Sequence, residues 1–406
     1  MIICLLLMLI PNSHRVIVII MNKAITAALT AICCIAATAG NFKLACNIDG
    51  LLPGDTVVCD QYQLIKFHTL HTDTVPVTEA GKVVIATDVD NPCEMIVRIY
   101  RNGEMLHNCH SGEQLFAMPG ETLTLSSSTG LLGSAEISGG IYDNPAVQEY
   151  LKEENAYAKS KISIYKQIER YRDADADSVK KYSDLYNANR PGERLMNLRK
   201  KLCMETNDNI FGALLYISHI HQVTAPELEK RIAEYSPEIQ SSYPGKVMKN
   251  HLAVLRNTET GATPRNFTLI DKDGNSHCLT DYRGHCLMLL NWGMCPGTFW
   301  ANPRIVPLYE KYHCKGFDIL GLTDTDWKKT EYYGSDEYLT EQIDSLAAHK
   351  WPTVYKENPA NAYIDDELYL PGVPFAILIS PEGKVIDRGF YNEIEDTLKA
   401  TLEQLP

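Results

Sequence analysis

The sequence lacks several features that define common classes of function. It has no block of basic residues, no phosphate-binding glycine loop, no nucleophile elbow and no cluster of metal ligands. Lysine and arginine total 38 against 51 acidic residues, so the formal net charge is −13. A surface this acidic repels a phosphate backbone. We therefore expect no nucleic-acid partner, no metal and no cofactor.

The first 40 residues lack acidic side chains altogether and hold only two basic ones, Arg15 and Lys23. From Met21 the chain has a charged start, an apolar run over residues 24–37 and small residues before Gly40. This is the layout of a secretory signal peptide, whether translation starts at Met1 or at Met21. We predict a leader over residues 1–39 and a periplasmic or cell-envelope location.

Two other interpretations of the leader are less well supported. A membrane anchor would need one apolar run through residues 2–39, but residues 11–15 interrupt it and neither half is long enough for a comfortable span. A lipoprotein anchor at Cys33 or Cys34 would follow residues that match a lipobox poorly. Export permits disulfides. Nine of the 12 cysteines lie beyond the leader, so an odd thiol is left free or paired outside the chain.

The chain is too long for one ordinary core, and its composition changes twice along its length. Residues 40–143 have short alternating strands separated by turn signals, which predicts an antiparallel β-sandwich-like module. In this module His107, Cys109 and His110 could be imagined as metal ligands. They share one hairpin and lack a partner pair, so we interpret them as polar residues at a strand edge.

Residues 144–258 are rich in Lys, Glu, Ala, Leu and Tyr, and predict a connector of about five helices. Asn144 and Pro145 are typical of a helix start, with an N-cap followed by proline. Thr224 and Glu227 have the spacing of a capping box. The tyrosines of this region are interpreted as helix-packing residues. Overall we expect a multi-domain chain: an N-terminal β module, an α-helical connector and a C-terminal α/β domain over residues 259–406.

The last domain alternates strands and helices in the order of a thioredoxin fold. A hairpin over residues 267–279 precedes a buried strand over 286–292. Cys295 follows, then a helix through Tyr312 and a second buried strand over 317–322. An irregular segment extends to about Leu370, and a hairpin and a closing helix end the chain. A βαβ start with a hairpin finish is the thioredoxin arrangement.

The order and spacing of several short motifs carry a family resemblance over these residues. They are Pro264-Arg265-Asn266-Phe267, Asp273-Gly274, Leu289-Leu290-Asn291-Trp292, Pro303-Arg304-Ile305-Val306, Gly316-Phe317, Trp327 and Gly372-Val373-Pro374-Phe375. Residues 261–406 resemble the TlpA/ResA-like thioredoxin-fold proteins of the bacterial envelope. These are thiol:disulfide oxidoreductases within the AhpC/TSA-like thioredoxin superfamily. The region before them resembles, more weakly, an N-terminal module of unknown function that is often fused to such domains.

The resemblance implies a site at Cys-x-x-Cys, at the start of the helix after the first core strand. Helix N-terminal N–H groups stabilise a thiolate, the first cysteine attacks a disulfide, and the second resolves the mixed disulfide. Here the motif is Cys295-Pro296-Gly297-Thr298, with Met294 in place of the usual tryptophan. The loop after Asn291 is two residues shorter than usual.

The resemblance also assigns roles to residues around the motif. The catalytic candidates are Cys295, Thr298 and Pro374, and the bond before Pro374 is expected to be cis. The candidate substrate-binding residues are Trp292, Met294, Pro296, Gly297 and Val373. Thr298 replaces the resolving cysteine, so the site has one thiol, and Thr298 could instead hydrogen-bond the sulfur and favour its thiolate.

A one-thiol site needs a second thiol from elsewhere to complete an exchange cycle. The local candidates are Cys278, Cys286 and Cys314, but Cys286 and Cys314 fall at the opposite pole, better placed to bridge each other. Three hypotheses follow. The first is thiol–disulfide exchange through Cys295, with protein or small-molecule thiols and disulfides as partners and an envelope redox protein as a candidate partner. The second is a redox-inactive binding or assembly protein. The third, a peroxiredoxin-like peroxidase, is disfavoured because that family places its threonine before the cysteine.

Overall fold

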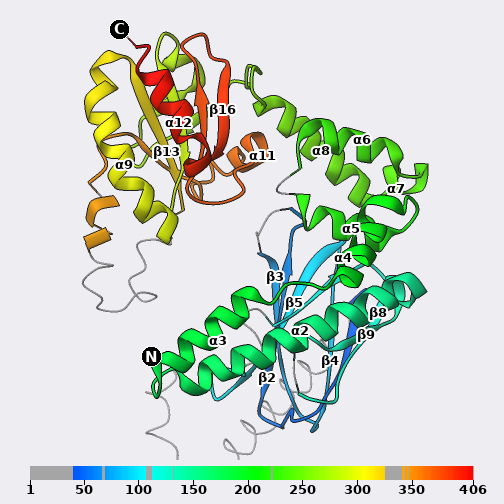
Figure 1. The fold of residues 1–406 in the computed structure, drawn as a ribbon. Helices are drawn as coiled ribbons and strands as arrows, with labels where there is room; N and C mark the ends of the chain where they lie inside the picture. The colour runs from blue at the N-terminus through cyan, green and yellow to red at the C-terminus, as the bar shows by residue number, and fades with distance from the viewer. Residues whose placement is uncertain are drawn as a thin grey trace, which may run out of the picture. The chain divides into compact units, whose positions relative to one another are not determined.

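The computed structural model describes residues 40–65, 69–106, 112–130, 132–220, 223–324, 341–342, 344–346 and 348–405 (Figure 1). The predicted leader and the residues His107, Cys109 and His110 lie outside these ranges. Contacts divide the chain into two compact units. The first comprises Met1–Ile220 with Glu234–Gly245, and the second His221–Ala233 with Lys246–Pro406. This division splits the helical region between the units, so the boundaries at 143 and 258 stay predictions.

The first unit begins with two β-sheets. The strands are β1 (Phe42–Ile48), β2 (Thr56–Tyr62), β3 (Thr69–Pro76), β4 (Lys82–Thr87), β5 (Cys93–Arg101), β6 (Glu104–Met105), β7 (Glu113–Ala117), β8 (Thr122–Ser127) and β9 (Glu136–Ser138). One sheet has the order β4-β1-β8-β9 and the other β3-β2-β5-β6, with β7 also paired to β5. The expectation of a purely antiparallel module was wrong, because β1 pairs with β8 in parallel.

The alternation of apolar and polar residues along β1 explains why one face of this strand packs into the core. Phe42, Leu44, Cys46 and Ile48 are buried, and the residues between them are exposed or half-buried. Successive side chains of a strand point to opposite faces, so one face of β1 packs inward. A buried apolar side chain such as Leu44 contributes about 1.5–3 kcal/mol to stability.

The helical region contains more helices than the five expected from the sequence. They are η2 (Gly140–Asp143), α2 (Pro145–Tyr171), α3 (Ala176–Ala188), α4 (Glu193–Lys200), the π-helix η3 (Lys201–Glu205), α5 (Ile210–Ile217), α6 (Ala225–Glu234), α7 (Pro237–Ser241) and α8 (Tyr243–Thr258). The predicted start of α2 is confirmed, because the Asn144 side chain accepts a hydrogen bond from Ala146 N–H. At α6, the Glu227 carboxylate accepts hydrogen bonds from both the N–H and the hydroxyl of Thr224.

The second unit carries the expected β–α alternation. Its elements are β10 (Thr268–Ile270), β11 (Ser276–Cys278), η5 (Leu279–Tyr282), β12 (Cys286–Asn291), α9 (Pro296–Tyr312), η6 (His313–Lys315), β13 (Phe317–Thr323), β14 (Thr353–Tyr355), α11 (Ile364–Leu368), β15 (Phe375–Ile379), β16 (Val385–Phe390) and α12 (Tyr391–Leu402). The five-stranded sheet has the order β14-β13-β12-β15-β16. Strands β12, β13 and β14 are parallel, whereas β15 and β16 are antiparallel to their neighbours. This topology is that of a thioredoxin fold.

Both faces of this sheet are covered, which accounts for the unbroken apolar run of β12. Met288 and Leu290 pack on one face with α9 and α12, and Leu287 and Leu289 pack on the other with α11 (Figure 1). All six residues of β12 are buried. Two elements, β14 and α11, fall in the segment expected to be irregular, because each is too short for a periodic pattern to show.

Candidate functional site

Cys295 occupies the N-cap of α9, directly after the loop that leaves β12. Its sulfur accepts a hydrogen bond from the Thr298 N–H at 3.2 Å. The Cys295 thiol donates a hydrogen bond to the Val373 carbonyl at 3.3 Å, and the Thr298 hydroxyl lies 3.3 Å from the sulfur, where either atom could donate. The first N–H groups of a helix have no partner within it and carry positive partial charge. The Cys295 sulfur therefore receives one of the free N–H donors at the start of α9.

Thr298 lies beneath the sulfur rather than on the surface. It is 3 % exposed, and its hydroxyl is close enough to Cys295 Sγ for either atom to donate the hydrogen. A second cysteine in this position would bring a second sulfur near the first. The structure thus brings together the two ends of the Cys-x-x-Thr motif as the spacing implied.

The Val373–Pro374 peptide bond is cis, as expected. The loop that contains it is tied down from two sides. The Pro374 carbonyl accepts a hydrogen bond from the Tyr391 N–H at 3.0 Å, and the Gly372 carbonyl accepts one from the Asn291 side-chain amide at 2.7 Å. Asn291 is 2 % exposed at the end of β12, and its anchoring contact was not anticipated from the sequence.

Gly297 allows the helix start to approach the proline loop closely. A Cβ atom at this position would lie 3.0 Å from Pro374 Cδ and 3.6 Å from Cys295 Sγ. The first distance is shorter than an ordinary carbon–carbon contact. Any side chain here would push the loop away or narrow the access to sulfur, so glycine suits this position.

The other candidate substrate-binding residues lie at different depths. Pro296 is exposed and Val373 is half-buried, so both are accessible at the surface. Met294 is partly buried against the core on the α9 face of the sheet. Trp292 is 2 % exposed and belongs to that core. A direct contact of Trp292 with substrate stays a prediction, and its observed place is beneath the site.

A stack of aromatic and polar side chains under α9 was missed by the sequence reasoning. The His349 ring lies 4.0 Å from the Trp351 ring and 5.1 Å from the Trp292 ring, centroid to centroid. His349 Nε2 contacts the Asn302 side-chain oxygen at 2.6 Å. Burial lowers the pKa of His349 to about 4, so the ring is neutral at pH 7. Gly321 permits this packing, because a Cβ there would lie 2.8 Å from Trp292 Nε1.

Two other cysteines of the second unit, Cys286 and Cys314, are poorly placed to serve Cys295. Cys286 is fully buried at the start of β12, and burial raises its pKa to about 12. Cys314 is exposed beyond the far end of the 17-residue helix α9, which is about 25 Å long at 1.5 Å per residue. The cysteines in the described ranges, Cys286 and Cys314 included, are free thiols, so no bridge joins these two there.

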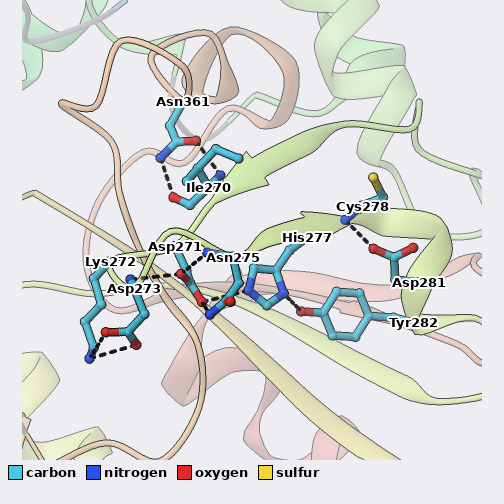
Figure 2. A network of polar contacts seen from close by, with 10 residues as sticks. All are labelled: Ile270, Asp271, Lys272, Asp273, Asn275, His277, Cys278, Asp281, Tyr282 and Asn361. Atoms are coloured by element: carbon cyan, nitrogen blue, oxygen red, sulfur yellow. Dashed lines mark hydrogen bonds and ion pairs between the residues drawn. The ribbon is translucent and has the colours of Figure 1, made fainter.

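A separate polar network holds the β10–β11 hairpin (Figure 2). Asp271 accepts a hydrogen bond from His277 Nε2 at 2.9 Å, and His277 Nδ1 lies 2.9 Å from the Tyr282 hydroxyl. Burial alone would raise the pKa of Asp271, but hydrogen bonds from His277, Asn275 and the Asp273 N–H outweigh it and lower the pKa to about 2. Every donor to Asp271 comes from the hairpin itself, and Asn361 pairs with the backbone of Ile270, so we assign the network to structure.

The ranges that the structure describes also bear on metal binding and membrane insertion. In these ranges no group of three or more His, Cys, Asp or Glu side chains could hold a metal ion. No helix within them is both long and apolar enough to cross a bilayer.

Comparison with known proteins finds similarity to solved structures over about a third of the chain. No family model and no curated protein sequence matches this chain. Solved structures do match. A thioredoxin domain of a thiol-disulfide oxidoreductase from Bacteroides vulgatus is 27 % identical, with a TM-score of 0.27, over 34 % of this chain and 97 % of that one.

Two further structures match the same share of the chain. A thiol:disulfide interchange protein from a Bacteroides species is 23 % identical, with a TM-score of 0.29, over 36 % of this chain and 92 % of that one. A thiol-disulfide oxidoreductase from Bacteroides fragilis is 22 % identical, with a TM-score of 0.27, over 35 % of this chain and 98 % of that one. These structural neighbours are thiol-disulfide oxidoreductase domains, and they leave about 65 % of the chain unmatched.

Proposed function

We propose that this protein is an exported thiol–disulfide exchange protein that works through Cys295 as the single thiol of its site. The observation that supports this most is the environment of the sulfur. An N–H at the start of α9 donates to it, a hydroxyl lies beside it, and the cis-proline loop faces it. The thiolate is the nucleophilic form of cysteine, and the helix N–H that donates to this sulfur can also donate to that form.

The first chemical step needs only Cys295 and a disulfide. The Cys295 thiolate attacks one sulfur of a client disulfide, the S–S bond breaks, and the other client sulfur leaves as a thiolate. The product is a mixed disulfide between Cys295 and the client. The Thr298 N–H and hydroxyl lie within hydrogen-bonding distance of the sulfur that attacks.

The second step needs a thiol from outside the site. A client thiolate, or a small monothiol, attacks the mixed disulfide and releases Cys295 as a thiolate. When the client supplies that thiol, its disulfides are rearranged and no electrons are gained or lost overall. With Thr298 at the resolving position, we assign the site to isomerisation or monothiol exchange rather than to net oxidation.

The partners in this proposal are protein or small-molecule thiols and disulfides, with a thiol protein of the envelope as a candidate donor. The leader-like sequence from Met21 supports export to the periplasm or cell envelope. An oxidising compartment is where substrates with disulfides occur. The N-terminal unit receives no role in the exchange chemistry.

Reaction with a defined disulfide client tests the proposal. Reduced wild-type protein incubated with scrambled ribonuclease should accumulate a mixed disulfide at Cys295, seen by non-reducing mass spectrometry. Cys295→Ser should form none. Cys314→Ser is the matched control, because it removes an exposed thiol outside the site, and it should behave as wild type.

A second function, a binding or assembly protein without turnover, is favoured by one observation. Thr298 leaves the site with no resolving thiol, and loss of that thiol ends the usual dithiol cycle. The same experiment separates the two functions. If wild type and Cys295→Ser retain the ribonuclease equally and without a covalent bond, the scaffold binds and the thiol is incidental.

A further inference from the structure

The first unit contains a cavity whose lining is partly aromatic and partly charged. Its volume is about 420 Å³. Cavities that hold small molecules measure about 300–1,000 Å³, so this one is large enough for a ligand. Strands β7 and β9 and helices α2, α4 and α5 contribute to the lining. All of these elements belong to the first unit, so the cavity is a feature of that unit alone.

Four aromatic side chains form the apolar part of the lining. The Phe211 ring meets the rings of Phe116 and Tyr142 edge-to-face, with centroids 5.6 and 5.4 Å apart. The Tyr150 ring is tilted against it, with centroids 6.1 Å apart. All four residues line the cavity and are at most 7 % exposed. Because edge-to-face packing holds the rings against one another, a ligand would meet a preformed apolar surface.

A close contact between α5 and the π-helix η3 positions two parts of the lining. Glycine is unfavourable inside a helix, yet Gly212 lies within α5. A Cβ atom on Gly212 would lie 2.3 Å from the Leu202 carbonyl oxygen in η3. Phe211 is the neighbour of Gly212, and Arg199 precedes η3 by two residues. The contact therefore joins the elements that carry Phe211 and Arg199. Single π-helical turns are rare and occur frequently at functional sites.

Arg199 supplies a hydrogen-bond donor that the protein does not use. Its Nη2 donates to Glu154 Oε2 at 2.9 Å, and the Tyr150 hydroxyl donates to the same oxygen at 2.8 Å. Arg199 Nε, in contrast, is buried and has no acceptor among the described residues. A buried N–H without an acceptor is costly, and native proteins rarely leave one. An oxygen atom of a ligand in this cavity would remove that cost.

Glu113 is a second polar group of the lining. It is 6 % exposed, and the N–H groups of Gly133 and Ala135 both donate to its Oε2. Oε1 receives neither of these hydrogen bonds. Burial raises the pKa of Glu113 to about 7, so the carboxyl is partly protonated at neutral pH. A protonated carboxyl is itself a donor, so it can also serve an oxygen of a ligand.

The charges around the cavity favour an uncharged ligand. Glu154 already balances the charge of Arg199, so an anion would find no excess positive charge and would approach two carboxyl groups. A cation would approach the guanidinium. We propose that this cavity binds a small uncharged molecule with an apolar, ring-sized body and a carbonyl or hydroxyl oxygen that accepts a hydrogen bond from Arg199 Nε. The site shares no residue with the site of Cys295, so the inference goes beyond the proposed function.

Four probes of similar size test the chemistry of the ligand. Acetophenone carries a ring and a carbonyl, toluene a ring alone, benzoate an anion and benzylamine a cation. Saturation-transfer NMR titrations with the full chain measure the four dissociation constants. Acetophenone should bind at about 1 mM, a value expected for a molecule of its size. It should bind at least about fivefold more tightly than the others, because it alone accepts the hydrogen bond without a charge. Tighter binding of benzoate or benzylamine, or no saturable binding of any probe, would overturn the proposal.

A pair of alanine variants tests the location. Ala158 of α2 is half-buried and lines the cavity, whereas Ala156 of the same helix is exposed and lies outside this lining. Ala158→Phe should fill part of the cavity and weaken acetophenone binding at least about tenfold. Ala156→Phe adds the same ring to the same helix and should bind as wild type does. Equal affinities in the two variants would mean that acetophenone binds elsewhere, and the site would be wrong.

Arg199→Lys tests the polar contact. The lysine can still pair with Glu154 but has no donor at the place of Nε. Its affinity for acetophenone should fall about fivefold, to that for toluene, while toluene binding stays unchanged. Arg194→Lys is the control, because Arg194 lies on the same helix, is 64 % exposed and pairs with Glu149 outside the cavity. Undiminished acetophenone binding in Arg199→Lys would contradict the assigned contact. Mixed-disulfide formation at Cys295 should be unaffected in both variants, so failure of this site and failure of the proposed function are separate results.

Discussion

The cysteines of the N-terminal β-sheets and the cysteine at the start of α9 occupy opposite environments. Cys46, Cys59 and Cys93 lie in strands β1, β2 and β5 and are at most 1 % exposed. Burial raises the pKa of Cys46 and Cys93 to about 12, and that of Cys59 well above its ordinary value. Cys295 is half-buried, with a helix N–H aimed at its sulfur.

This contrast shows that the number of cysteines says little about function in this chain. In a strand core, cysteine behaves as a small apolar side chain, and charging it would place an uncompensated anion among apolar groups. At the start of a helix the same side chain meets donors and positive partial charge. We therefore expect Cys295 to differ in chemical reactivity from the buried cysteines.

Among the changes proposed here, replacement of Thr298 by cysteine should have the largest effect on the chemistry of Cys295. The Thr298 hydroxyl lies 3.3 Å from Cys295 Sγ, so a sulfur there can attack a mixed disulfide from within the site. An intramolecular attack has a high effective concentration, and the mixed disulfide with scrambled ribonuclease should fall at least about tenfold in Thr298→Cys. Non-reducing mass spectrometry measures it.

The control for this change is Thr298→Val, which removes the hydroxyl and adds no thiol. It should still accumulate the mixed disulfide, but more slowly than wild type because the sulfur loses one polar neighbour. A Thr298→Cys protein that accumulates as much mixed disulfide as wild type would show that the position is not a resolving one.

The pKa of a buried carboxyl group is also shifted in opposite directions in the two units. Glu113 of β7 is 6 % exposed and accepts N–H groups from Gly133 at 2.5 Å and Ala135 at 3.0 Å, yet burial dominates and raises its pKa to about 7. Asp271 of the thioredoxin unit receives enough hydrogen bonds to lower its pKa to about 2. Between these two pKa values the Glu113 carboxyl is protonated, whereas the Asp271 carboxyl is ionised.

Glu113 should therefore make the free energy of unfolding depend on pH. Its folded pKa of about 7 exceeds the ordinary 4.5, so its contribution is complete below pH 4.5 and is lost as the pH rises through 7. The loss is about 3 kcal/mol at most, since each pKa unit corresponds to about 1.4 kcal/mol. Glu113→Gln keeps an acceptor oxygen and should remove this slope.

Urea unfolding of the full chain at pH 5 and pH 8, followed by circular dichroism, measures this difference. The wild-type protein should lose more stability than Glu113→Gln between the two pH values. Parallel pH dependences for the two proteins would mean that Glu113 is already ionised in the folded state at pH 5.

Local sequence patterns were enough to predict most of the second unit. The apolar run of β12 and the proline, cysteine and glycine around it have strong local signals, and the structure has β12, α9, β13 and β15 where they were expected. The parallel pairing of β1 with β8 was not predictable, because strand order depends on contacts between residues far apart in sequence.

The site was predictable at its centre and not at its edges. The family resemblance named Cys295, Thr298 and Pro374, and in the structure the Cys295 sulfur contacts Thr298 and the residue before Pro374. The anchoring amide of Asn291 and the stacked rings of His349 and Trp351 come from other segments, and no periodic or motif signal connects them with the helix start. The exposure of Trp300 depends on packing around α9, which the sequence pattern does not specify.

The rate of thiol labelling at each cysteine tests the central claim most directly. Native protein treated briefly with iodoacetamide at pH 7 and then digested gives one rate for each cysteine by mass spectrometry. We predict that Cys295 labels faster than the exposed Cys314 and at least about 100-fold faster than Cys46, Cys59 and Cys93, because only a thiolate reacts. Labelling of Cys295 as slow as that of the buried cysteines would contradict the account.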